Sequence, residues 1–245
     1  MSFARLAAAL TVILGFAAAA EAQVACGPFT AAPLDPPAPR TESWAIPTFQ
    51  NINVAVKTQP YRVLFLGDSI TFRWDYPLWG AKPVWDANMP QRGVLNAGVA
   101  GDRTEHVLWR LDHGNLDGPA PKLVILLIGT NDLAHGRPPE LAAQGIRAIL
   151  IHLRQKLPQT RILLLGLTPR GATPDDPLRQ EVGVVNRLIQ TCADNMITYA
   201  DIGGVLLDGK GVLSTSLSPD LLHFSGAGYK RLAPKLDQLI DQLSK

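Results

Sequence analysis

Short hydrophobic runs alternate with longer amphipathic segments over most of this chain. Five runs are nearly continuous in apolar residues instead of alternating between apolar and polar positions, which is typical of parallel strands covered on both faces. These predicted strands are residues 63–66, 94–97, 123–128, 161–165 and 197–202. Because helical patterns lie between them, the order is β-α-β, which indicates an α/β domain built on a parallel sheet of about five strands.

Four of the intervening segments show apolar residues at helical spacing. These predicted helices are residues 104–111, 140–157, 178–193 and 225–243. The first opens with Thr104 as its N-cap and carries Glu105 in its first turn. A further helix is expected to begin at Ser69. No repeat and no second-domain boundary interrupts the pattern, so residues 61–245 are predicted to form one domain.

The first part of the chain does not share this pattern. Residues 1–22 start with a weakly basic stretch, continue with an apolar run and end in Ala20-Glu21-Ala22, which is typical of a secretory signal peptide. A membrane anchor is the alternative, but the apolar run falls short of the ~20 residues of a spanning helix. Residues 23–60 are rich in proline and predict an irregular, extended arm laid over the domain. We expect the mature protein to begin at Gln23, to keep no integral membrane segment and to be secreted or periplasmic.

Export makes a disulfide possible, and the chain has two cysteines, Cys26 in the arm and Cys192 near the end of a predicted helix. A bridge between them and two free thiols are both compatible with this spacing. A lipoprotein signal leading to Cys26 is a weaker alternative, because Gln23 stands where such signals favour an aliphatic residue. The cysteines have no neighbouring histidines and therefore give no metal-site pattern.

The formal net charge of the chain is +2. Removal of Arg5 and Glu21 with the signal peptide leaves that charge unchanged. No basic tract and no interleaving of basic with aromatic residues suggests nucleic-acid binding. The composition therefore argues against a polyanion held by charge alone, and a small-molecule partner is expected.

The first candidate for chemistry is Ser69, in Gly67-Asp68-Ser69 directly after a predicted strand. A hydroxyl at this place lies close to the backbone amides of a helix N-terminus, which stabilise anionic oxygen. The simpler interpretation is that Ser69 or Asp68 only caps the helix. Thr71 occupies the position of the second glycine in the Gly-x-Ser-x-Gly elbow, so that motif is absent.

Asp220 and His223 lie three residues apart between the last predicted strand and the last helix. On one helical turn they would share a face, and the carboxylate could then hold the imidazole and stabilise its protonated form. Such a carboxylate is expected to raise the pKa of His223 above the ordinary value of about 6.5. The alternatives are a solvent-exposed pair without a role and, for the base, His135.

Two more residues follow predicted strands. Asn131, in Gly129-Thr130-Asn131-Asp132, can aim a side-chain NH₂ at developing negative charge, and the backbone N–H of Gly101 can approach the same oxygen. The simpler alternatives are a helix cap for Asn131 and a turn glycine with positive φ for Gly101. Each alternative is strong alone, but candidate groups after four strands of one sheet favour a shared site.

These blocks give the chain a family resemblance: GDSI contains Ser69, NAGVAGD contains Gly101, GTND contains Asn131 and DLLH contains Asp220 and His223. The chain resembles the GDSL-type or SGNH hydrolases, named after the block residues serine, glycine, asparagine and histidine. More narrowly, it resembles the catalytic α subunits of intracellular platelet-activating-factor acetylhydrolase from about residue 63 to the end. It differs from them in its export signal, its proline-rich arm and the aspartate after the block asparagine.

The resemblance implies a three-layer α/β/α, flavodoxin-like fold and an esterase that needs no metal or other cofactor. It also implies that Ser69 is the nucleophile, His223 the general base and acid, and Asp220 its orienting partner. The oxyanion hole would consist of the Ser69 backbone N–H, Gly101 and Asn131. The expected reaction is hydrolysis of short-chain acyl esters, above all acetyl esters, through an acyl-enzyme.

Three other functions are compatible with the sequence. A carbohydrate O-acetylesterase would use Trp74, Trp79, Trp85 and Trp109 as aromatic faces for sugar, although packing explains tryptophans at least as often. A lysophospholipase-type acylhydrolase has the same fold. A non-catalytic secreted binding module is disfavoured, because it has no need of the complete set of catalytic residues.

Overall fold

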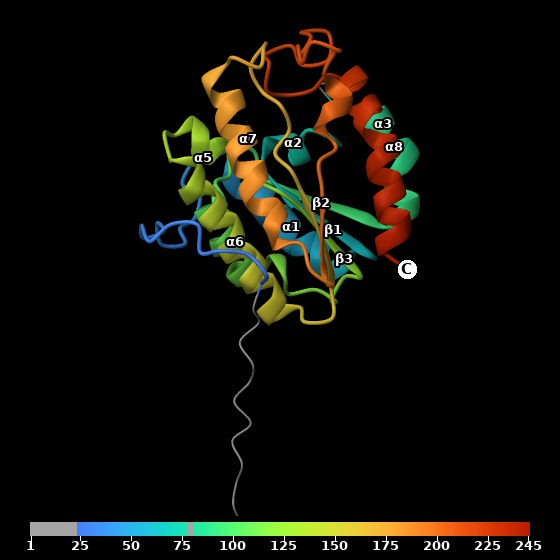
Figure 1. Cartoon of the computed structure of the whole chain (residues 1–245). Coiled ribbons are helices and arrows are strands. Elements are labelled where there is room, and N and C mark those ends of the chain that lie inside the picture. The colour runs from blue at the N-terminus through green and yellow to red at the C-terminus, as the bar shows by residue number, and fades with distance from the viewer. Residues whose placement is uncertain (1–23, 78–80) are drawn as a thin grey trace, which may run out of the picture.

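The computed structural model describes residues 24–77 and 81–245 and contains one parallel sheet with helices on both faces (Figure 1). The order across the sheet is β2-β1-β3-β4-β5, and all neighbouring strands are parallel. Strands β1 to β5 are Val63–Gly67, Val94–Gly98, Leu123–Leu127, Arg161–Leu165 and Ile197–Ala200. The predicted three-layer α/β fold with five strands is confirmed. The signal peptide, the expected start at Gln23, and Trp79 lie outside the described residues.

Helices form the two outer layers. They are α1 (Ala45–Thr58), α2 (Ser69–Phe72), α3 (Lys82–Asn88), α4 (Thr104–Arg110), α5 (Thr130–Ala134), α6 (Pro139–Lys156), α7 (Pro177–Ile189) and α8 (Gly226–Leu243). Helices α4, α6 and α7 pack in sequence on one side of the sheet, whereas α3 and α8 pack against each other on the opposite side (Figure 1). Short 3₁₀ segments occur at Pro90–Arg92, Gln190–Cys192 and Gly203–Leu206, and a π-type turn at Leu111–Asn115.

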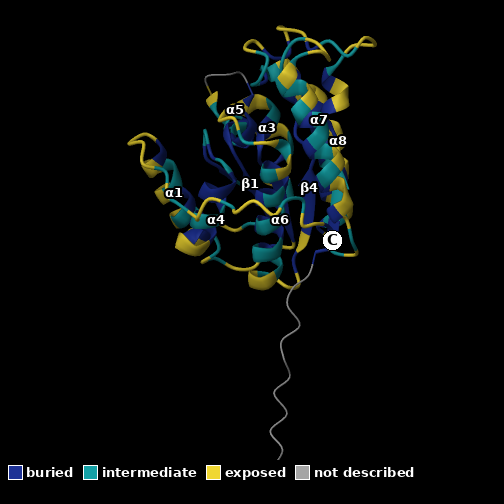
Figure 2. Cartoon of the chain, turned by 60° about the vertical axis from the view of Figure 1, so that its left-hand side comes forward, coloured by how far each residue is buried: buried dark blue, intermediate teal, exposed yellow. Residues whose placement is uncertain are grey.

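The core lies on both faces of the sheet. Every residue of the central strands β1 and β3 is buried. Figure 2 shows the buried strand β1 among helices whose exposed residues lie on their outer sides. This explains why the strand sequences are continuously apolar, since the side chains on both faces of the sheet pack against other parts of the protein. No helix within residues 24–77 and 81–245 has the length and apolar character needed to cross a bilayer.

The prediction that residues 23–60 are irregular is wrong for their second half, which forms α1. Pro47 does not prevent this helix, because it lies in the first turn, where a backbone N–H has no partner within the helix. The helix buries Ala45, Ile52 and Val56 and packs against β2 and the turn that follows α4. Only the preceding segment, residues 24–44, is irregular, and we call it the strap.

The start of α4 also differs slightly from the prediction. Arg103 is the N-cap and Thr104 is the first helical residue. The Thr104 hydroxyl does not cap its own helix but donates to the buried carboxylate of Asp132 over 2.7 Å. The side chain is therefore used for a tertiary contact, which the local pattern does not reveal.

The two cysteines are joined in a disulfide, which answers the question that their spacing left open. The bridge fixes the beginning of the strap to Cys192, just beyond α7. Helix α6 holds the same region, because Arg147 Nε donates to the carbonyl of Cys26 over 2.7 Å and the Phe29 N–H donates to Gln144 over 3.0 Å. The start of the strap is thus attached to the domain by the disulfide and by these two hydrogen bonds.

Replacement of both cysteines by serine should lower the free energy of unfolding by about 2–4 kcal/mol, because the disulfide closes a long loop in the unfolded chain. Urea denaturation with and without reductant measures this loss. Reductant should destabilise the wild type to the level of the double variant and leave that variant unchanged. Equal stability of the oxidised wild type and the variant would contradict the expectation.

Candidate active site

The turn after β1 places Ser69 at the carboxyl edge of the sheet. Asp68 caps α2, accepting a hydrogen bond from the Ile70 N–H over 2.9 Å, and Ser69 is the first residue of that helix. Only 5% of the Ser69 surface is exposed. The hydroxyl therefore lies at a helix start, as the sequence predicted, and in a largely desolvated place.

A chain of two hydrogen bonds connects Ser69 to residues near the end of the chain. The Oγ atom of Ser69 lies 2.8 Å from Nε2 of His223, although the residues are 154 positions apart. The other ring nitrogen, Nδ1, lies 2.7 Å from Oδ2 of Asp220. The structure thus brings the predicted serine, imidazole and carboxylate into one line.

Asp220 and His223 do not lie on a helical turn, so the predicted local conformation is wrong. The segment is a bend in which Leu221 has a φ of 59°, in the left-handed region that favours glycine. The bend lets Asp220 Oδ1 accept the N–H groups of Leu222 over 3.1 Å and His223 over 2.7 Å. One carboxylate oxygen fixes the backbone while the other receives the ring, and this orients the imidazole.

The expected rise in the pKa of His223 is also wrong. Burial lowers this pKa, and the positive charges of Arg73 and Arg170 act in the same direction. The hydrogen bond and charge of Asp220 act to raise it but do not outweigh the burial. The imidazole is therefore neutral, and able to accept a proton, to a lower pH than an ordinary histidine.

In the pKa of the Asp220 carboxyl, the effect of burial is outweighed by hydrogen bonds. Partial burial acts to raise its pKa, but the hydrogen bond from the His223 ring and the two backbone N–H groups outweigh that effect. The pKa of Asp220 consequently lies below its ordinary value. The carboxylate stays ionised beside a neutral imidazole, as an orienting partner requires.

The two remaining predicted residues lie on the turns after the strands that flank β1. Gly101 follows β2 and has a φ of 75°, so a glycine is favoured there. Asn131 follows β3 as the second residue of α5, and because Gly129 is the N-cap, Asn131 is not a helix cap. Its Nδ2 atom donates to the carbonyl of Asp102 over 2.9 Å, which ties the two turns together.

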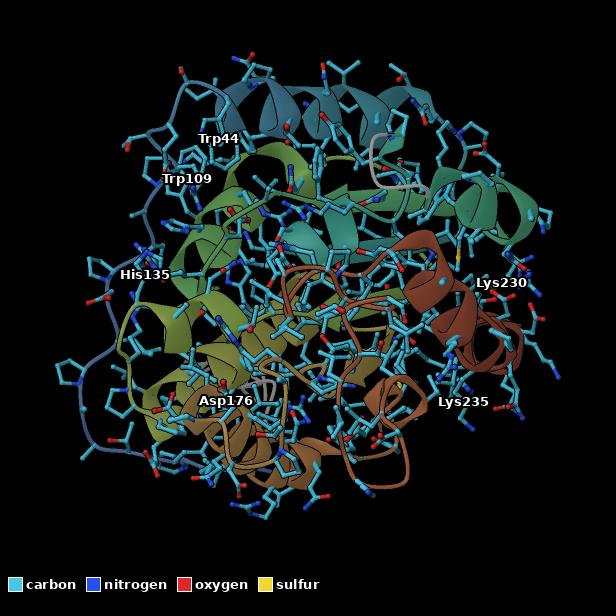
Figure 3. The ribbon with its side chains drawn as sticks, turned by 90° about the horizontal axis from the view of Figure 1, so that it is seen from above. Trp44, Trp109, His135, Asp176, Lys230 and Lys235 are labelled. Carbon is cyan, nitrogen blue, oxygen red and sulfur yellow. A yellow bond between two sulfur atoms is a disulfide. The ribbon has the colours of Figure 1, made fainter. Side chains whose placement is uncertain are left out.

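His135 does not join this group. Its side chain is exposed, and its Nδ1 atom lies 2.8 Å from the carbonyl of Asn131 in the preceding turn. Figure 3, which looks down on the carboxyl edge of the sheet, shows it near the rim of the molecule. The histidine within hydrogen-bond distance of the Ser69 hydroxyl is His223 instead.

Two of the tryptophans considered as sugar-binding faces are part of the core. Trp74 is completely buried and Trp85 is 6% exposed. Trp109 is half-buried and its ring stacks on that of His113 at 3.9 Å. Of the described tryptophans, the most exposed is Trp44, at 54%, for which no role was predicted.

A buried ion pair beneath the site was not predicted. Arg110 Nε donates to Asp102 over 2.8 Å, and Arg110 Nη2 donates to the carbonyl of Gly67 at the end of β1 over 3.0 Å. Burial raises the pKa of Asp102 to about 6 against the opposing effect of Arg110. The pair connects the turn after β2 to the strand that carries Ser69. Only its long-range partners distinguish Arg110 from a surface arginine, so the local sequence holds no signal for this role.

Comparison with known proteins identifies the family. A model of the GDSL-like lipase/acylhydrolase family matches residues 65–231, which is more than half of the chain. The chain belongs to this family. As a GDSL-like acylhydrolase it is an ester hydrolase, and the resemblance inferred from the sequence blocks is confirmed.

The chain is also similar to named acetylhydrolase subunits. It is 37% identical to platelet-activating factor acetylhydrolase IB subunit alpha2 of Rattus norvegicus over 183 residues, which are 74% of this chain and 76% of the relative. It is 33% identical to subunit alpha1 of Homo sapiens over 189 residues, which are 76% of this chain and 78% of the relative.

Solved structures share the fold at lower identity. A GDSL-like lipase from Bacteroides thetaiotaomicron has a TM-score of 0.64 and 19% identity, covering 79% of this chain and 96% of its own. Axe2, an acetylxylan esterase from Geobacillus stearothermophilus, has a TM-score of 0.58 and 20% identity, covering 76% of this chain and 95% of its own. At these identities the likeness shows the fold alone.

The environment of His223 predicts its titration. NMR of the imidazole should give a pKa below the ordinary value of about 6.5 in the native protein and near that value in the urea-unfolded chain. Asp220→Asn removes a contribution that raises the pKa, so it should lower the native value further. A native pKa above that of the unfolded chain would show that burial does not dominate. A rise in the variant would show that Asp220 does not raise the pKa of His223.

Proposed function

We propose that this GDSL-like hydrolase cleaves short-chain acyl esters, above all acetyl esters, with Ser69 as the nucleophile. The observation that carries the proposal is the line from Asp220 through His223 to Ser69, with successive separations of 2.7 and 2.8 Å. A neutral imidazole at hydrogen-bond distance from a serine is the arrangement needed to activate the hydroxyl.

In the acylation step, Ser69 Oγ attacks the ester carbonyl carbon while its proton passes to Nε2 of His223. The tetrahedral intermediate then collapses, the bond from carbon to the alcohol oxygen breaks, and the imidazolium gives its proton to that oxygen. Water repeats the sequence on the acyl-enzyme and releases the acid together with free Ser69. The ionised Asp220 stabilises the positive ring in both steps.

The oxyanion hole consists of the Ser69 N–H, the Gly101 N–H and the side chain of Asn131. The Ser69 amide belongs to the first residue of α2 and has no partner within that helix. The NH₂ group of Asn131 has two hydrogens. The carbonyl of Asp102 takes one of them, which leaves the other for the substrate. These donors stabilise the negative oxygen that forms in the transition state.

The preference for acetyl groups is supported by the names of the relatives, which are acetylhydrolase subunits. A carbohydrate O-acetylesterase is the second candidate, because a protein of the same fold is an acetylxylan esterase. Among the described tryptophans, Trp44 and Trp109 are the ones available for an aromatic sugar face, since Trp74 and Trp85 are buried. A lysophospholipase-type acylhydrolase is the third, and a panel of acetylated sugars, lysophospholipids and longer p-nitrophenyl esters separates the three.

We also propose that the protein is exported after cleavage behind Ala22 and acts as a secreted or periplasmic enzyme. The disulfide between Cys26 and Cys192 supports this location, because such bonds persist in oxidising compartments. The same bond argues against a lipid-modified Cys26, whose sulfur it already occupies. The arrangement of residues 1–22 into a basic start, an apolar run and a small-residue site is the other support.

Ser69→Ala should reduce hydrolysis of p-nitrophenyl acetate by several orders of magnitude with the fold intact, because the nucleophile is lost. A fluorophosphonate should label the wild type at Ser69 and leave the variant unlabelled. Thermal unfolding serves as the control for the fold. Turnover that persists in the variant, or a label on another residue, would remove Ser69 from this role. A wild type that hydrolyses none of the panel esters would favour the non-catalytic binding module.

Asn131→Ala should lower kcat by roughly 10²–10³ and change KM little, since one oxyanion donor is lost. Steady-state kinetics on an activated acetyl ester measure both constants. The matched control is Asn88→Ala, which removes a partly buried side-chain amide of α3. Comparable kcat values in the two variants would show that Asn131 acts only in the structure of its turn.

A further inference from the structure

The strap lies outside the segment that matches the family, which begins at residue 65, yet it reaches the candidate active site. It starts at the disulfide beyond α7, crosses α6 and contacts α4, where the Ala38 N–H donates to the carbonyl of Glu105 over 3.4 Å. In Figure 3 its ribbon follows one edge of the carboxyl-end face and leads to Trp44. A segment outside the family match therefore borders the site.

Arg40 of the strap lies directly on Gly101. A Cβ atom added to Gly101 would come within 2.7 Å of Arg40 Nη1 and 3.0 Å of Nη2, so the guanidinium covers the Cα side of this residue. The ring of Trp44 lies on the guanidinium as well, 5.2 Å from its centre to Cζ. The Arg40 side chain is only 12% exposed. The guanidinium is thus enclosed between a backbone turn and an aromatic ring.

Glu42 fixes the guanidinium in this position. Arg40 Nε donates to Glu42 Oε2 over 2.9 Å, and Nη2 donates to Oε1 over 2.7 Å. This two-pronged contact depends on the planar geometry of arginine, which lysine does not share. The carboxylate also balances part of the charge of Arg40.

A second attachment of the strap lies beside Asn131. Arg137 is paired with Asp35 of the strap and, on its other side, with Asp132 over 2.7 Å and Glu105 over 2.6 Å. Asp132 is buried and immediately follows Asn131. The strap therefore contacts the Gly101 turn directly and is linked to the Asn131 turn through Arg137.

We propose that Arg40 is a positioning residue for the oxyanion hole, acting by holding the Gly101 turn. The proposal rests on the proposed function, in which the Gly101 N–H binds the oxyanion. Gly101 has no Cβ, so its backbone is freer than that of other residues and can adopt the positive φ seen here. The packed guanidinium restricts that freedom. Because an oxyanion donor acts only from the right position, a small displacement of this turn lowers the rate far more than it changes substrate binding.

Arg40→Ala should lower kcat by about 10–100-fold on an activated acetyl ester while KM changes little. Binding of a trifluoromethyl ketone, whose tetrahedral adduct with Ser69 places a negative oxygen in the hole, should weaken by the same factor. Arg40→Lys should resemble Arg40→Ala, and added guanidinium should restore part of kcat only in Arg40→Ala. Glu42→Gln leaves the arginine in place but loosens it, and it should give a smaller fall in kcat. The matched control is Arg187→Ala, which removes an exposed arginine from α7.

All rates are normalised to the sites that a fluorophosphonate labels, so a poorly folded variant does not count as a slow one. A kcat of Arg40→Ala within twofold of the control, or full activity in Arg40→Lys, would overturn the proposal. Should Arg40→Ala fail to fold, an unchanged kcat in Glu42→Gln would overturn it equally. Failure of the proposed function would be seen as persistent turnover in Ser69→Ala, which is a different outcome from those that overturn the role of Arg40.

Discussion

The parallel pairing of three strands is the constraint on which the candidate site depends. Gly67 at the end of β1 pairs with Gly98 of β2 and Leu127 of β3, so the three strands end at the same level. Ser69, Gly101 and Asn131 follow these strand ends within a few residues. Their placement at the same edge of the sheet is therefore a consequence of register, and a shift of one strand would move its residue away from the other two.

His223 belongs to a different part of the fold and meets the serine only through tertiary packing. Helix α8 begins just after it, and Tyr229 of that helix is buried and donates to the carbonyl of Ile70 in α2 over 2.7 Å. This contact holds the last helix against the helix that starts with Ser69. The hydrogen bond between imidazole and hydroxyl rests on that packing, and burial in turn keeps the ring neutral.

Buried charged groups beneath the site hold its turns, although removing these charges from water costs free energy. Asp102 and Asp132 are fully buried, and each is paired with an arginine from another element. Buried ion pairs add little net stability compared with apolar packing, but removal of one partner leaves an uncompensated charge. Such pairs favour one arrangement of the turns over others. Their place beside Gly101 and Asn131 suits turns whose backbone must be held in one position, and the strap adds Arg40 and Asp35 to the same arrangement.

The sequence by itself determined the sheet, most helices, the reaction class and the serine, histidine and aspartate that the fold brings together. These features depend on local periodicity and on short motifs after strands, which are readable without distant partners. Helix α1 was missed because its proline suggested a break, although a proline is tolerated in a first turn.

Only the tertiary structure decided the remaining features. The disulfide, the bend at Leu221 and the contact of Arg40 with Gly101 join residues whose neighbours are set by the folded chain. The lowered pKa of His223 has the same origin, because burial is a property of the surroundings and the sequence showed only the aspartate that opposes it. Local sequence therefore specifies which groups are present, and packing specifies how they are oriented and charged.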